Sequence, residues 1–253
     1  MRQKITSHKI RQIFVIIATL AVIFVNYLAG TAKINNVDQK EISDKYINLL
    51  TPEGYAFAIW GIIYLGLIGF SIYQAFPSQT TNSRFQKIRP LYIASCAANI
   101  AWIYAWHYDQ ILISLGLMLT ILLTILLINR VLYLEPSKGT TFEIMLTRIP
   151  FGIYFGWITA ATILNVTIAL VFVGFALPAN ISVIAACVVI AIATILAIAV
   201  RRGFENILYP LTIAWALIAI AIKQQSETAI IATGIIGAII SVTSIFFKKK
   251  FYY

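Results

Sequence analysis

The feature that most constrains this chain is a succession of long apolar stretches that contain almost no charge. Runs of about 20 apolar residues match the roughly 30 Å hydrocarbon core of a bilayer. Eight stretches approach this length, at about 12–29, 55–76, 91–108, 110–134, 149–174, 180–200, 207–222 and 228–247. Only 11% of the 253 residues are charged, whereas soluble domains carry about 25%. The sequence therefore predicts an all-α, polytopic membrane helix bundle of about eight transmembrane helices in a lipid bilayer.

Basic residues divide unequally between alternate connections of these stretches. If both chain ends share a side with the second, fourth and sixth connections, 15 of the 19 Lys and Arg residues lie on that side. The opposite side receives Lys33, Lys40, Lys45 and Lys223. Because cytoplasmic connections are enriched in Lys and Arg, this partition predicts that both termini are cytoplasmic. It also accounts for the formal net charge of +10, so we expect no nucleic-acid partner.

The first connection, residues 31–54, is the one long connection in the chain. It carries charged residues together with Tyr46, Ile47, Leu49 and Leu50. Connections of this length in a compact protein are commonly functional. The apolar side chains predict that this connection packs back on the bundle as a lid.

Charged residues are missing from the middle of all eight stretches, which excludes several kinds of membrane chemistry. Neither a Schiff-base lysine nor a carboxylate proton relay is available. The two histidines, His8 and His107, are too few for a ligand cluster, so we expect no metal site. His107 and Asp109 flank a short turn, where we expect a solvated interfacial pair.

Asparagine and tryptophan are the informative residues inside the stretches. An Asn within a span must share its amide with another helix or with a ligand, and Asn99 and Asn165 leave both alternatives open. Trp60, Trp102 and Trp157 also lie inside their stretches rather than at the interface that indoles prefer. Buried indoles beside amides favour an aromatic-lined cavity, with ordinary aromatic packing between helices as the alternative.

Small residues repeat at intervals of four in the fifth stretch, at Gly152, Gly156 and Ala160. Such a row allows two helix backbones to approach closely. The pattern predicts a close helix contact, either within one chain or between two copies.

Three motifs occur in a fixed order along the first part of the chain. They are TPEGYAFAIWGIIY at 51–64, ANIAW at 98–102 and YFGWITAATILN at 154–165. Together they resemble the second, third and fifth helices of the tryptophan-rich sensory protein and translocator protein (TspO/MBR) family. The resemblance covers about residues 10–175 and implies two parts. Residues 1–175 are expected to form a TspO-like five-helix bundle, and 176–253 three additional transmembrane helices with a basic cytoplasmic tail.

The resemblance also implies a cavity beneath the long first connection. Carried over position by position, the residues that face or support this cavity are Trp60, Tyr64, Asn99, Trp102, Trp157, Ala161 and Asn165. In the family such a cavity binds tetrapyrroles or other flat hydrophobic molecules, often in a dimer. We therefore expect a hydrophobic ligand, with a porphyrin or haem-like tetrapyrrole as the example, and a homodimer as a further expectation.

Three function classes follow from these expectations. The leading one is a membrane protein that binds a flat hydrophobic ligand as a sensor or regulator, without a required cofactor. The alternatives are a transporter of such a ligand and a photo-oxidative, porphyrin-degrading enzyme. We identify no catalytic residue, because the sequence offers no nucleophile paired with a base.

Overall fold

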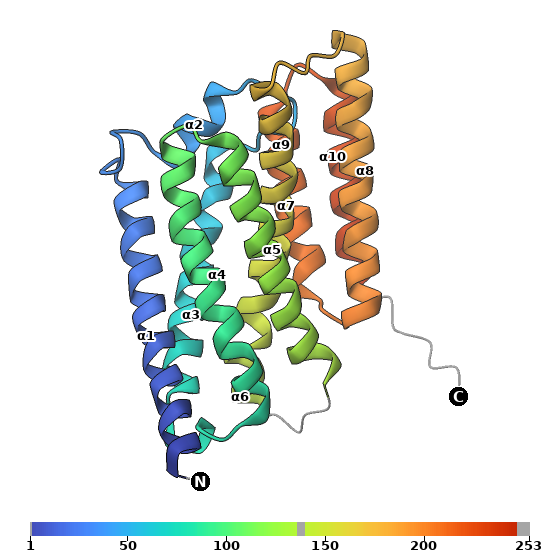
Figure 1. The fold of residues 1–253 in the computed structure, drawn as a ribbon. Helices are drawn as coiled ribbons and strands as arrows, with labels where there is room; N and C mark the ends of the chain where they lie inside the picture. Colours follow the sequence, from blue (N-terminus) through green and yellow to red (C-terminus); the bar gives the residue numbers. More distant parts are fainter. Residues whose placement is uncertain (1, 136–139, 247–253) are drawn as a thin grey trace.

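The computed structural model describes residues 2–135 and 140–246, and these residues form helices without a strand. The long helices are α1 (Arg2–Gly30), α3 (Ile59–Gln74), α4 (Ser83–His107), α5 (Ile111–Leu134), α7 (Arg148–Phe172), α8 (Ala179–Phe204), α9 (Leu208–Lys223) and α10 (Thr228–Thr243). They run side by side along one axis (Figure 1). One long helix lies at each of the eight predicted stretches, so the all-α bundle is confirmed.

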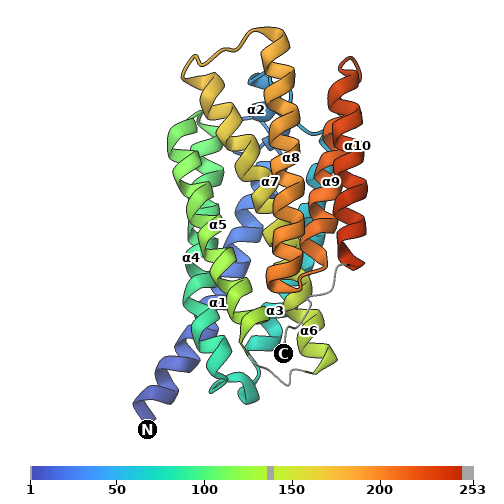
Figure 2. The same cartoon turned by 90° about the vertical axis from the view of Figure 1, so that its right-hand side faces the viewer.

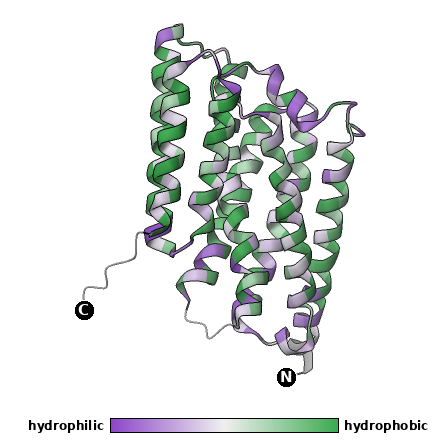
Figure 3. Ribbon diagram, turned by 180° about the vertical axis from the view of Figure 1, so that it is seen from behind, coloured by the Kyte–Doolittle hydropathy of each residue, from purple (hydrophilic) through white to green (hydrophobic). Residues whose placement is uncertain are grey.

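Six candidate spans in the described residues are long and apolar enough to cross a membrane. They include α1, α3, α5, α7, α8 and α10. Of the other two long helices, α9 is apolar but only 16 residues long, and α4 contains several charged and polar residues. Figure 3 shows hydrophobic residues along the middle of the bundle and hydrophilic residues gathered at its ends. The chain is therefore an integral, multi-pass membrane protein.

Helix α4 begins eight residues before the predicted start at residue 91. Its N-cap is Asn82, whose side chain accepts hydrogen bonds from the backbone N–H groups of Arg84 and Phe85, as capping residues do. Arg89 is fully buried and donates to Gln74 Oε1 at 2.8 Å. The basic residues thus belong to the helix, whereas hydropathy alone places them in a connection.

Helix α1 begins and α10 ends at the same end of the bundle, the lower end in Figure 1. This agrees with an even number of crossings. The cytoplasmic location of that end stays a prediction. Near this end, Arg84 and Glu143 form a buried ion pair at 2.7 Å, and Glu143 belongs to the short helix α6 (Thr141–Leu146).

The three C-terminal helices pack on the others through α9. Helix α9 contacts α7, α8 and α10, and Figure 2 shows it between α8 and α10. A Cβ atom added to Gly156 of α7 would lie 2.7 Å from Thr212 Cβ and 2.9 Å from Tyr209 O, both on α9. The row of small residues therefore serves, at Gly156, as a close contact within one chain, the first of the two predicted alternatives.

Residues 31–58, called the lid below, cover the end of the bundle opposite the chain ends. The lid contains α2 (Gln39–Lys45) and the 3₁₀ helix η1 (Gly54–Ala58). Leu50 is 5% exposed and packs inward, which confirms the predicted packing for this residue. Ile47 is 90% exposed, so its predicted inward position is wrong.

Candidate tryptophan cavity

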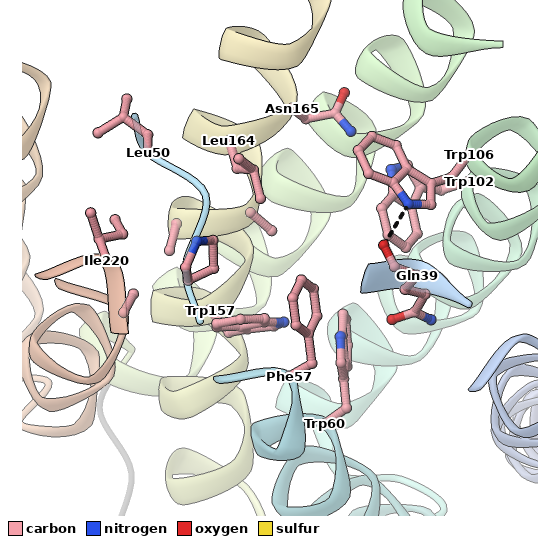
Figure 4. A pocket seen from close by; sticks show the side chains of 14 residues that line it. Gln39, Leu50, Phe57, Trp60, Trp102, Trp106, Trp157, Leu164, Asn165 and Ile220 are labelled. Carbon is pink, nitrogen blue, oxygen red and sulfur yellow. Dashed lines mark hydrogen bonds between the residues drawn. The ribbon is translucent and has the colours of Figure 1, made fainter. Parts of the chain in front are cut away.

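A small cavity lies beneath the lid, between α3, α4, α7 and α9. Its volume is about 40 Å³. Figure 4 shows Phe57 and Trp157 next to each other, Trp102 and Trp106 on the α4 side, and Leu50 and Ile220 on the opposite side. The lining residues are Gln39, Leu50, Pro52, Phe57, Trp60, Trp102, Trp106, Trp157, Ala160, Ala161, Leu164, Asn165, Ala216 and Ile220. We call this space the tryptophan cavity.

The aromatic rings of the cavity pack against one another in two groups. Trp102 and Trp106 are stacked, with ring centroids 5.5 Å apart. Trp157 meets Phe57 edge to face at 5.8 Å and Trp60 at 6.2 Å. These separations are typical of favourable aromatic pairs. The rings therefore form a preorganised apolar lining.

Five of the seven predicted site residues line the cavity. They are Trp60, Trp102, Trp157, Ala161 and Asn165. The sixth, Tyr64, lies behind Trp60 and stacks on it at 5.4 Å. The seventh is Asn99, which is absent from the cavity lining.

Asn99 instead joins α1, α4 and α7 through hydrogen bonds. Its Oδ1 accepts from Asn26 Nδ2 at 2.8 Å, and its Nδ2 donates to Tyr154 Oη at 3.4 Å. Asn26 in turn accepts from Gln39 Nε2 at 3.3 Å. The amide of Asn99 is therefore shared between helices, which favours the structural alternative at this position.

Hydrogen-bond donors without protein acceptors distinguish the tryptophan cavity. Trp102 is 6% exposed and Trp157 3%, yet neither indole N–H has a partner among the described residues. In contrast, Trp106 Nε1 donates to Gln39 O at 3.3 Å. Buried polar groups are rarely left unpaired because each costs about 1–3 kcal/mol. The unpaired indoles suit a bound hydrogen-bond acceptor.

Asn165 extends this pattern. Its Oδ1 accepts from Ser114 Oγ at 3.3 Å, while its Nδ2 donates to no acceptor in the part of the chain that the structure describes. Among the residues that the structure describes, no charged side chain lines the cavity. The unpaired polar groups that α4 and α7 contribute to the cavity are thus hydrogen-bond donors.

Several lining residues escaped the sequence analysis. Phe57 and Trp106 lie within or close to the recognised motifs, so aromatic spacing was an available signal. Ala216 and Ile220 belong to α9, outside the expected five-helix part. No local pattern marks these small and aliphatic residues, because only the packing of α9 against α7 brings them to the cavity.

Polar contacts at four places fasten the lid to α9 and its C-terminal end. Ala56 O accepts a hydrogen bond from Trp215 Nε1 at 3.1 Å, and Glu53 N donates to Ala219 O at 3.0 Å. Asn48 O accepts from Gln224 Nε2 at 3.3 Å, and Asp44 Oδ1 accepts from Lys223 Nζ at 3.3 Å. Trp215 also meets Tyr55 edge to face at 5.2 Å. Helix α9 therefore both lines the cavity and anchors the lid that covers it.

Electrostatics support the closed lid. Burial alone would raise the pKa of the Asp44 carboxyl, but hydrogen bonds from Lys40 and Lys223 outweigh it and hold the pKa below its ordinary value. On the other side of the lid, burial and a 3.0 Å hydrogen bond to Asp109 raise the pKa of Tyr46 to about 12. Asp44 therefore stays ionised and Tyr46 stays protonated at neutral pH.

The prediction that His107 and Asp109 form a solvated interfacial pair is wrong. His107 is fully buried, and its Nδ1 lies 2.8 Å from Ile103 O. Asp109 instead pairs with Lys45 and accepts from Tyr46. The cation that pairs with Asp109 is Lys45 of the lid, which is distant in the sequence and so cannot be predicted from the residues of the turn.

Comparison with known proteins gives one match. The family model described as TSPO-like protein matches residues 12–247, which include α8, α9 and most of the remaining chain. No curated protein and no solved structure matches. The match runs through both predicted parts, and the division at residue 175 stays a prediction.

Proposed function

Because the chain belongs to the TSPO-like protein family, we propose that it binds a flat hydrophobic ligand in the tryptophan cavity and acts as a sensor or regulator. The observation that carries this proposal is the pair of buried, unpartnered indole N–H groups of Trp102 and Trp157. They lie in a cavity whose other lining side chains are aromatic or aliphatic, except for Gln39 and Asn165. A ligand with acceptor atoms within reach of these N–H groups would offset the free-energy cost of burying them without partners.

The ligand chemistry follows from the lining. Aromatic faces favour a flat ring system, and burial of apolar area contributes roughly 25 cal/mol per Å². The unpaired donors favour carbonyl, carboxylate or imine acceptors on or beside that ring. A tetrapyrrole combines these properties and is our first candidate.

The closed cavity is too small for such a ligand. It measures about 40 Å³, whereas ligand pockets usually have about 300–1,000 Å³. Leu50, Pro52 and Phe57 bring the lid into the lining. We therefore propose that binding displaces these residues, so that lid opening accompanies ligand entry.

Titration with protoporphyrin IX in mild detergent tests the proposal. A flat ring within contact distance of Trp60, Trp102 or Trp157 should quench tryptophan fluorescence in a saturable manner. Mass spectrometry of small molecules that co-purify with the protein provides an independent search for the natural ligand. Unsaturable quenching, together with co-purification of nothing but bilayer lipid and detergent, would reject the proposal.

A further inference from the structure

A second, separate space lies beside the tryptophan cavity, and none of the described residues that line it is aromatic. This inner chamber, of about 30 Å³, is lined by aliphatic residues of the lid, α7, α8 and α9. It shares Leu50, Ala160, Leu164, Ala216 and Ile220 with the tryptophan cavity. Rings thus line one side of the combined space and aliphatic side chains the other.

The inner chamber adjoins a groove at the lid end of the bundle. This groove, of about 440 Å³, lies between the lid, α7 and α8, and its lining includes Ile47, Leu170, Phe175 and Val189. Leu50 lines all three spaces, and Val189 lines both the chamber and the groove. The tryptophan cavity, the inner chamber and the groove are thus neighbouring apolar spaces divided by shared lining residues, and Leu50 stands between them.

We propose that displacement of Leu50 joins these spaces into one apolar route, which holds the aliphatic chain of a ligand whose flat ring occupies the tryptophan cavity. The inference rests on the proposed function and specifies its ligand as a ring with acceptor atoms and an isoprenoid or acyl chain. The polar side chains of the groove already have hydrogen-bond partners within the protein: Ser182 Oγ donates to Leu177 O, and Thr167 Oγ to Ile163 O. The Asn48 amide donates to Tyr46 O and accepts from Leu50 N. Such a lining suits a chain without polar groups.

The geometry also sets a length for the chain. From Ala161 in the cavity to Leu170 in the groove, α7 rises about 14 Å at 1.5 Å per residue. A staggered carbon chain advances about 1.3 Å per bond, so about eleven carbons bridge this distance. Three isoprene units are sufficient.

Two probes with the same ring isolate the contribution of the chain. They are 2-methyl-1,4-naphthoquinone and the same ring carrying a farnesyl chain, both of which offer carbonyl acceptors and quench tryptophan fluorescence. The measured quantity is the ratio of their affinities in each protein variant. Partitioning into detergent affects this ratio equally in all variants, so differences between variants report the protein site.

Ala193→Phe should block the chamber. Ala193 is 5% exposed and lines the chamber but not the tryptophan cavity. We expect the preference for the farnesyl probe to fall by at least about fivefold, the lower end of what overpacking costs. Ala191→Phe is the matched control, because Ala191 lies exposed on the same helix and should leave the ratio unchanged.

Leu50→Ala tests the junction in the opposite direction, since it removes the side chain that lines all three spaces. We expect it to increase the preference for the farnesyl probe, and it keeps the test decisive if Ala193→Phe folds poorly. Binding of both probes with a ratio that neither substitution changes overturns the chain site and leaves the proposed function intact. Failure of the wild-type protein to bind either probe, while protoporphyrin IX still binds saturably, overturns the chain site alone, whereas failure with protoporphyrin IX as well overturns both.

Discussion

Asn99 and Asn165 both lie deep in the bundle, but their amide groups have different surroundings. Both hydrogen-bonding ends of the Asn99 amide are used by Asn26 and Tyr154. Asn165 accepts from Ser114 and lines the tryptophan cavity with its remaining donor. One residue type therefore fills a structural position on α4 and a proposed ligand position on α7.

Replacing each asparagine by Leu should separate these roles. Asn99→Leu leaves Tyr154 Oη without its partner and should lower stability by about 1–2 kcal/mol. Asn165→Leu should cost little stability, because Ser114 Oγ also donates to Ile111 O. It should weaken protoporphyrin binding about three- to tenfold. Thermal unfolding in detergent and fluorescence titration would measure the two effects, and identical profiles for both variants would contradict this assignment.

Trp157 offers a test of the ring and of its N–H separately. Trp157→Phe keeps an aromatic face against Phe57 but removes the unpaired donor, whereas Trp157→Leu removes both. We expect affinity for protoporphyrin to decrease about threefold in the first variant and up to about tenfold in the second, since ring pairing contributes on the order of 0.5–1.5 kcal/mol. Quenching of the remaining tryptophans reports binding in both. Equal affinity in all three proteins would place the ligand elsewhere.

At the scale of helices, the contact of α7 with α9 depends on the absence of a side chain at Gly156. Gly156→Ala should destabilise the protein by about 1–3 kcal/mol, because the new Cβ would lie 2.7 Å from Thr212 Cβ and 2.9 Å from a backbone oxygen. Gly116→Ala on α5 is the matched control, since no atom lies within 4 Å of the added Cβ. There, better helix propensity should raise stability by up to about 1 kcal/mol. Thermal unfolding that ranks these variants in the reverse order would contradict close packing of α7 on α9.

The lid should loosen in acid because Asp44 ties α2 to α9. The folded-state pKa of Asp44 is lowered, so its contribution to stability is present above the ordinary value of 3.8 and is lost as pH falls through the folded-state pKa. Amide hydrogen exchange across the lid should be faster in Asp44→Asn than in the wild type at about pH 6. As pH falls below 3.8 toward the folded-state pKa of Asp44, this difference should shrink. A difference that persists unchanged at the lower pH would exclude this mechanism.

At the scale of the whole molecule, the basic residues predict the orientation in the membrane. A reporter fused after Tyr253 should lie in the cytoplasm, and one inserted near Asn36 in the lid should lie on the opposite side. This follows because α1 begins and α10 ends at the end of the bundle away from the lid (Figure 1). Reporters found on the same side would contradict the predicted number of crossings.

The sequence predicts the helices better than it predicts their neighbours. Apolar length locates all eight long helices because crossing a bilayer imposes that length. The same criterion misses the first turns of α4, where Arg89 is buried by specific hydrogen bonds. Apolar length also does not predict that Ala216 and Ile220 reach the cavity, because the periodic pattern of a helix does not tell which other helix packs against it.

The cavity of about 40 Å³ also limits how tightly any ligand can bind. A site that admits its ligand only in a minor open conformation has an apparent dissociation constant equal to the intrinsic one divided by the open fraction. An open population of about 1% would weaken binding roughly 100-fold and would slow association to the rate at which open molecules appear. In return, ligand binding would raise the fraction of molecules with an open lid. The lid lies on the membrane face opposite the chain ends, where a second protein could detect the change without contacting the ligand.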